Sequence, residues 1–92
     1  MKIKISYYGQ ARMVRGIQNE EIEVDENVSV KDAVKVLVGF HGENLKKLLL
    51  TPEGELLQSV LLPVNDEVID ADKPGLLKEY DDISIFPAMA GG

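Results

Sequence analysis

Few side chains in this sequence are equipped for chemistry. The 92 residues include no cysteine and a single histidine, His41, so the chain offers no thiol nucleophile, disulfide or thiolate metal site. Serines are present, but one histidine does not by itself indicate a Ser-His-Asp triad. The glycines are scattered and form no phosphate-binding loop. Side-chain catalysis therefore has little to work with.

The remaining candidate is the backbone at the end of the sequence, where Gly91 and Gly92 follow Ala90. Glycine has no Cβ, so such a segment can enter a channel that is too narrow for side chains. It would present an unhindered α-carboxylate on Gly92. The alternative is a frayed terminus without a function, since chain ends are commonly disordered. We expect a folded domain of residues 1–87 followed by a functional Gly-Gly tail of residues 88–92.

Composition limits the class of protein. A chain of 92 residues with 45% hydrophobic residues is expected to form one soluble domain with a modest core. Neither an apolar run of membrane-spanning length nor a signal peptide is evident, so we expect a cytoplasmic protein. The formal charge of -6 argues against nucleic acid and anionic membranes as partners. A basic protein partner is one interpretation of that charge, and a solvated acidic surface is the other.

The elements that must position the tail can be read from hydrophobic periodicity. Alternation predicts a strand over residues 2–7, with Ile3, Ile5 and Tyr7 on the buried face, and a second strand over residues 21–25. Between them we expect a polar loop. Ser29 and Asp32 fit a capping box, and an apolar stripe from Val30 to Val38 predicts a helix that stops at Gly39 or Gly42.

The second half of the chain gives weaker signals. Residues 44–50 fit either a short helix or an irregular segment. A strand is predicted over residues 60–64, where Pro63 indicates a free edge or a bulge, followed by a short strand at residues 68–69. A last strand is expected over residues 83–86, with Ile83 and Ile85 inward.

This order of elements predicts the fold class. One main helix packed on one mixed sheet of four to five strands is an α+β solution to burying both apolar faces. The first and last strands can lie side by side and parallel at the centre through a right-handed crossover. We therefore expect a ubiquitin-like β-grasp.

Three segments carry a resemblance to a known family. Val64-Asn65-Asp66, residues 81–87 and the final Ala90-Gly91-Gly92 closely resemble the MoaD/ThiS family of β-grasp sulfur carriers. The Phe86-Pro87 step looks more like the molybdopterin synthase small subunit than the thiamine carrier. The sequence departs from the family pattern at Asp66, where glycine is frequent, and at Met89, where a smaller residue is common.

The resemblance implies that Gly92 is the reactive residue. A ubiquitin-activating-like adenylyltransferase (MoeB-like) would adenylate its carboxylate with ATP and magnesium, and sulfur would then replace one oxygen to give a thiocarboxylate. The tail, with Met89, Ala90 and Gly91, would enter a large molybdopterin synthase subunit (MoaE-like) and supply sulfur for the dithiolene of the molybdenum or tungsten cofactor. Catalytic groups would belong to those partners, so this chain would hold no permanent cofactor or metal and would not be catalytic alone.

Docking must use other residues, because the glycine tip offers little apolar area. On the expected strands, Leu61, Pro63 and Phe86 point away from the core, and with Pro87 they would form an apolar docking patch. The alternative is that Phe86 folds back over the sheet as an ordinary rim residue.

Other functions share the same tail chemistry. A ubiquitin-like modifier would join Gly92 to substrate lysines, and a sulfur carrier could serve thiamine synthesis or tRNA thiolation instead. A β-grasp adaptor with an incidental tail is a further alternative. The sequence does not separate these functions.

Overall fold

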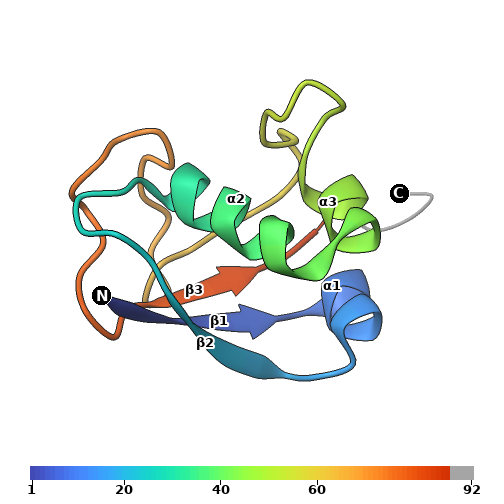
Figure 1. Ribbon diagram of the computed structural model, residues 1–92, viewed down its shortest axis with the longest axis horizontal. Helices are drawn as coiled ribbons and strands as arrows, with labels where there is room; N and C mark the ends of the chain where they lie inside the picture. The colour runs from blue at the N-terminus through green and yellow to red at the C-terminus, as the bar shows by residue number, and fades with distance from the viewer. Residues whose placement is uncertain (88–92) are drawn as a thin grey trace.

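Over the part of the chain that the structure describes, the fold combines one mixed sheet with three helices. Figure 1 shows the computed structural model, which describes residues 1–87. Its regular elements are, in chain order, β1 (Lys2–Tyr7), α1 (Gly9–Arg15), β2 (Asn19–Glu23), α2 (Val30–His41), α3 (Glu43–Leu49) and β3 (Asp82–Ile85). The long helix α2 packs against one face of the sheet, and the core lies between them. The expected α+β class is confirmed.

The strands lie in the order β2-β1-β3, so the first strand is central. β1 is antiparallel to β2, with Ile3 opposite Ile22, and parallel to β3, with Ile5 opposite Ile83. The first and last strands are therefore parallel neighbours, as expected. This topology brings the end of the folded domain beside the end of β1.

Residues 60–64 extend the sheet beyond β3 without completing a fourth regular strand. Leu61 and Phe86 exchange two backbone hydrogen bonds of 3.0 Å, and the Ser84 N–H donates to the Pro63 carbonyl at 2.9 Å. Pro63 has no N–H to return that bond, so the pairing is reduced to isolated bridges. The expected four to five strands become three regular strands and this bridged edge.

Helix α2 begins and ends where local chemistry dictates. The Ser29 hydroxyl accepts from the Asp32 N–H at 3.0 Å, and the Asp32 carboxylate accepts from the Ser29 N–H at 3.4 Å, which confirms the capping box. The helix continues through Gly39 and ends at Gly42. The φ of 83° and ψ of -165° at Gly42 form a backbone conformation that essentially only glycine adopts.

The structure corrects the expectations for two local segments and decides a third that the sequence left open. Residues 9–15 form helix α1, where we expected a loop; Ala11 is its one buried side chain, so the segment lacks the apolar stripe that would predict a helix. Residues 43–49, which were ambiguous, form helix α3. No strand forms at residues 68–69: a bridge from Val64 to Glu67 closes a tight turn there, and the Val68 side chain is exposed.

The buried side chains match the predicted inner faces of the strands and helix. The core contains Ile3, Ile5, Tyr7, Ile22, Val24, Val30, Ala33, Val34, Leu37, Leu45, Leu49, Leu62, Val64, Ile83 and Ile85, among others. Within residues 1–87, no helix has both the length and the apolar character that crossing a bilayer requires. The result is a close-packed domain that holds both ends of β1 and β3 in place.

Candidate functional site

Backbone hydrogen bonds fix the point at which the tail would leave the domain. β3 ends at Ile85, whose carbonyl accepts a hydrogen bond from the Tyr8 N–H at 3.1 Å. Phe86 is held by its two bonds to Leu61, and Pro87 is the last residue that the structure describes. The chain is therefore anchored to the sheet through Phe86.

An apolar surface surrounds this exit point. Leu61 is 56% exposed, Tyr8 42% and Phe86 39%. The Tyr8 and Phe86 rings stack with centroids 4.4 Å apart and planes 10° from parallel. Pro63 is half-buried two residues along the edge from Leu61. We call Tyr8, Leu61, Pro63 and Phe86 the tail-root surface.

Sequence reasoning identified three members of this surface and missed Tyr8. The structure brings Leu61 and Phe86 together, and the Phe86 ring stacks on Tyr8 while staying partly exposed; its part in docking remains a prediction. The signal for Tyr8 was available: it follows the inward-facing Tyr7, and the parallel register of Tyr7 with Ile85 places the next residues, Tyr8 and Phe86, side by side.

The remaining candidate residues, Met89, Ala90, Gly91 and Gly92, lie outside the described residues. Their roles in carrying sulfur or entering a partner remain predictions. What the structure adds is the surroundings of the residues that precede them.

A polar cluster lies at the same end of β1 and accounts for His41. The Glu20 carboxylate accepts a hydrogen bond from the Tyr7 hydroxyl, and it pairs with Arg15 Nη2 at 3.1 Å and His41 Nε2 at 3.0 Å. The Arg15 guanidinium lies over the Tyr7 ring, 5.7 Å from its centroid. Tyr7, Arg15, Glu20 and His41 form what we call the Glu20 cluster. His41 thus serves as a structural partner of a carboxylate.

The contacts within the Glu20 cluster shift the pKa values of Tyr7, Glu20 and Arg15. Burial would by itself lower the Arg15 pKa, but hydrogen bonds to Tyr7 and Glu20 raise it. Partial burial would by itself raise the pKa of Glu20, but hydrogen bonds from Tyr7 and Arg15 and the charges of Arg15 and His41 outweigh burial and lower that pKa. Burial raises the pKa of the Tyr7 hydroxyl, and the hydrogen bond to Glu20 raises it further. At neutral pH the cluster therefore holds an ionised carboxylate and a neutral phenol.

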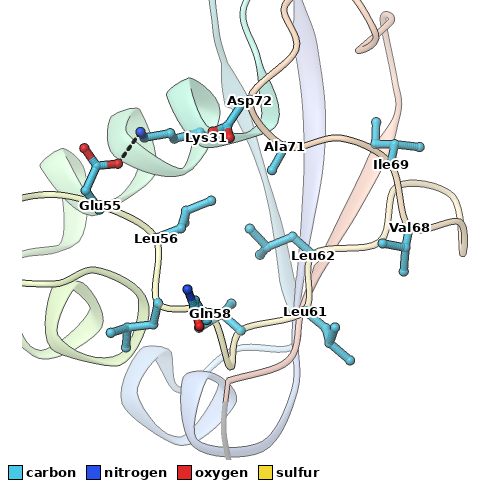
Figure 2. A pocket seen from close by; sticks show the side chains of 12 residues that line it. Lys31, Glu55, Leu56, Gln58, Leu61, Leu62, Val68, Ile69, Ala71 and Asp72 are labelled. Atoms are coloured by element: carbon cyan, nitrogen blue, oxygen red, sulfur yellow. Dashed lines mark hydrogen bonds and ion pairs between the residues drawn. The ribbon is translucent and has the colours of Figure 1, made fainter.

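A separate hollow of about 290 Å³ lies between the start of α2 and residues 55–72. Figure 2 shows Leu56 and Leu62 pointing toward each other across it, while Leu61 points away. An ion pair between Lys31 and Glu55 lies at its rim. The charged residues of the lining are Lys31, Glu55 and Asp72, and the rest of it is mainly apolar.

The described residues show no metal centre. Across residues 1–87, no three or more His, Asp or Glu side chains are grouped so that they could hold a metal ion. The arrangement that the structure does provide is a rigid domain with an apolar, aromatic surface at the exit of its C-terminal segment.

Comparison with known proteins identifies relatives along the whole chain. The molybdopterin synthase sulfur carrier subunit of Chlamydomonas reinhardtii is 21% identical over 92 residues, and the alignment covers 100% of both chains. Two solved structures are similar in fold. SAMP1 from Haloferax volcanii has a TM-score of 0.87 at 24% identity and covers 100% of both chains. Putative molybdopterin converting factor, subunit 1, from Pyrococcus furiosus has a TM-score of 0.75 at 27% identity, with 97% of this chain and 99% of that chain covered.

These likenesses confirm the ubiquitin-like β-grasp fold. The family assignment comes from a separate match, in which the pattern of the ThiS family fits residues 5–92. That span includes the second half of β1, the tail-root surface and the final glycines. The chain belongs to the ThiS family.

Proposed function

We propose that this protein is the sulfur carrier of molybdopterin synthase, acting as the small subunit of that enzyme. The observation that carries the proposal is the end-to-end match with a relative named molybdopterin synthase sulfur carrier subunit. The Phe86-Pro87 step before Ala90-Gly91-Gly92, and the membership of the ThiS family, support it.

The proposed chemistry takes place on the Gly92 carboxylate. A carboxylate is a poor acyl donor, so a MoeB-like activating enzyme would join it to AMP from ATP with magnesium, and pyrophosphate would leave. A sulfide-level sulfur nucleophile would then attack the acyl carbon and displace AMP, so that the C–O bond to AMP is replaced by the C–S bond of a thiocarboxylate. The sulfur would be held on the backbone terminus, so the absence of cysteine costs this protein nothing.

Partner binding would rely on the tail-root surface. Tyr8 and Phe86 form a rigid aromatic pair, and aromatic residues of this kind carry a large share of the binding energy at protein interfaces. Leu61 is hydrogen-bonded to Phe86 through the backbone and lies beside it. Docking there would place the tail at the mouth of the partner's active site, and a MoaE-like large subunit would supply the catalytic groups.

Intact-mass analysis of the protein purified from its own cells tests this proposal. We expect a species in which one oxygen is exchanged for sulfur, and fragmentation should locate the exchange at Gly92. Incubation with the activating enzyme, ATP, magnesium and a sulfur donor should increase that species. Failure to form it under those conditions would contradict the proposal.

A C-terminal extension provides the matched control. One bulky residue added after Gly92 should abolish loading and leave the unfolding temperature unchanged. If the extended chain were loaded as well as the unmodified chain, Gly92 would not be the carrier residue.

The alternative is a ubiquitin-like modifier that joins Gly92 to lysines of other proteins. The observation that favours it is the likeness in fold to SAMP1, where the solved structure of the same protein is described as small archaeal modifier protein 1. The chemistry is identical up to the adenylate. Recovery of peptides in which Gly92 is joined to a lysine side chain, without any thiocarboxylate, would favour this role.

A further inference from the structure

The Glu20 carboxylate adds polar contacts between elements that also meet through sheet pairing and the core. Glu20 lies on β2, and its partners come from β1 (Tyr7), α1 (Arg15) and the last residue of α2 (His41). The Arg15 and Glu20 side chains are each only 20% exposed, so this ion pair is shielded from solvent more than a typical surface pair. One side chain therefore holds three neighbouring elements at the tail end of the sheet.

Helix α1 depends on such an external contact. It has seven residues, and isolated helices shorter than about 12 residues are marginal in water. Its N-terminus has no side-chain cap and no acidic residue in the first turn, and Ala11 is its one buried residue. Arg15 is the last residue of α1, where its charge is favourable to the helix dipole and its guanidinium reaches Glu20.

The other end of α1 is part of the tail-root surface. Tyr8 is the N-cap residue of α1, with an extended backbone at φ -132° and ψ 156°, and its ring stacks on Phe86. Gly9 follows with a φ of 57°, so the backbone turns sharply between the strand and the helix. The position of the Tyr8 ring is therefore set by β1 on one side and by α1 on the other.

We propose that Glu20 is a positioning residue for partner docking, which acts through Arg15 and α1 to hold the Tyr8 ring against Phe86. Glu20 itself does not belong to the tail-root surface. The inference rests on the proposed function only in taking Tyr8 and Phe86 to be contacts with the partner. A preorganised surface binds more tightly because less conformational freedom is lost on association.

The first experiment uses the free protein and needs no partner. Glu20→Gln keeps the shape of the side chain and removes its charge. We expect faster amide hydrogen exchange across α1 and weaker nuclear Overhauser contacts between the Tyr8 and Phe86 rings, while amides of α2 keep their protection. Glu21→Gln is the matched control, because Glu21 is the exposed neighbour on the same strand and should change neither measurement.

The second experiment measures binding to the large molybdopterin synthase subunit by calorimetry. Glu20→Gln should raise Kd by about fivefold, a loss of the size expected when an ordered interface side chain becomes mobile. In a Tyr8→Ala background the same substitution should have little further effect, since the residue that it positions is gone. If Glu20→Gln fails to fold, Arg15→Gln tests the same connection and leaves the contacts of Glu20 with Tyr7 and His41.

Two results would overturn the inference. One is unchanged exchange in α1 and an unchanged ring contact in a folded Glu20→Gln protein. The other is an equal loss of affinity whether Tyr8 is present or absent. If the wild-type protein does not bind the large subunit at all, the proposed function fails, and the exchange and ring-contact measurements on the free protein still decide the role of Glu20.

Discussion

At the scale of single residues, the polar side chains at the tail end of the described domain contact one another, and the chemistry proposed for this protein lies on the backbone of Gly92. The one histidine and the charged residues nearest the tail end are engaged with one another in the Glu20 cluster. Tyr80, by contrast, is held in an unfavourable conformation. It is 70% exposed with a φ of 68°, a region that an L-residue with a bulky side chain rarely adopts.

Tyr80→Gly should therefore stabilise the domain. Glycine adopts this φ without a steric penalty, and after the greater freedom of glycine in the unfolded chain is allowed for, we expect a gain of about 0.5–1 kcal/mol in the free energy of unfolding. Chemical denaturation measures it. Tyr80→Ala is the control, since it removes the ring and keeps the Cβ; an equal gain in both variants would show that the backbone conformation is not the cause.

The lowered pKa of Glu20 predicts a pH dependence. Because its pKa is lower in the folded state than in the unfolded state, its contribution to stability is present above the unfolded pKa and is lost as pH falls through the folded pKa. The free energy of unfolding of Glu20→Gln should therefore fall less steeply than that of the wild type in acid. Denaturation curves of both proteins across acidic pH test this, and equal slopes for the two would contradict it.

At the scale of elements, sequence patterns predicted those segments whose stabilising signal is local. The alternation of Ile3 and Ile5 and the capping box of Ser29 each specify an element directly, and both expectations are confirmed. Helix α1 was missed because it buries only Ala11 and because its ion pair joins Arg15 to Glu20, a residue of another element. An ion pair between two elements produces no hydrophobic periodicity in the sequence.

At the edge of the sheet, a local signal was recognised in the sequence but did not determine the number of strands. Pro63 was recognised as a residue that cannot donate to a ladder, but its effect on the strand count depends on the pairing of Leu61 with Phe86. For the site, the outward-facing members were predictable from alternation, whereas the stacking of Tyr8 on Phe86 required the parallel register.

The cap of α2 can be tested at this scale. Ser29→Ala removes the hydroxyl that accepts from the Asp32 N–H and leaves that donor without its partner, so we expect a loss of about 1 kcal/mol in the free energy of unfolding. Thermal and chemical denaturation measure the loss. Ser59→Ala, at an exposed position outside the regular elements, should change stability little; comparable losses in the two variants would contradict a capping role.

At the scale of the whole molecule, the domain has two opposite ends, and only one of them carries the tail-root surface. The tail-root surface lies where β1 and β3 end, whereas the connection that leads into β3 lies near the N-terminus (Figure 1). Tyr80 belongs to that opposite end, where its N–H donates to the Lys2 carbonyl at 2.7 Å. Exposed aromatic rings therefore occur at both ends, and those at the tail end are the ones expected to bind partners.

Substitutions at the two ends should separate binding from folding. Phe86→Ala removes a stacked ring from the tail-root surface and should weaken binding to the large subunit by about 2 kcal/mol, the size of an interface hot spot. Tyr80→Asn removes an exposed ring at the other end, and the fold should be kept because asparagine tolerates a positive φ. Since Tyr80 lies outside the tail-root surface, the affinity should be unchanged. Calorimetry compares the variants; equal affinities for Phe86→Ala and wild type would remove Phe86 from the interface.

The parallel pairing of β1 and β3 also has a mechanical consequence. The chain enters the sheet at the start of β1 and leaves it after the end of β3, at opposite ends of two hydrogen-bonded neighbours (Figure 1). A pull on the C-terminal segment against the N-terminus would slide one strand along the other and load their hydrogen bonds together in shear. A pull between the two termini is therefore expected to require the hydrogen bonds between β1 and β3 to break together rather than one after another.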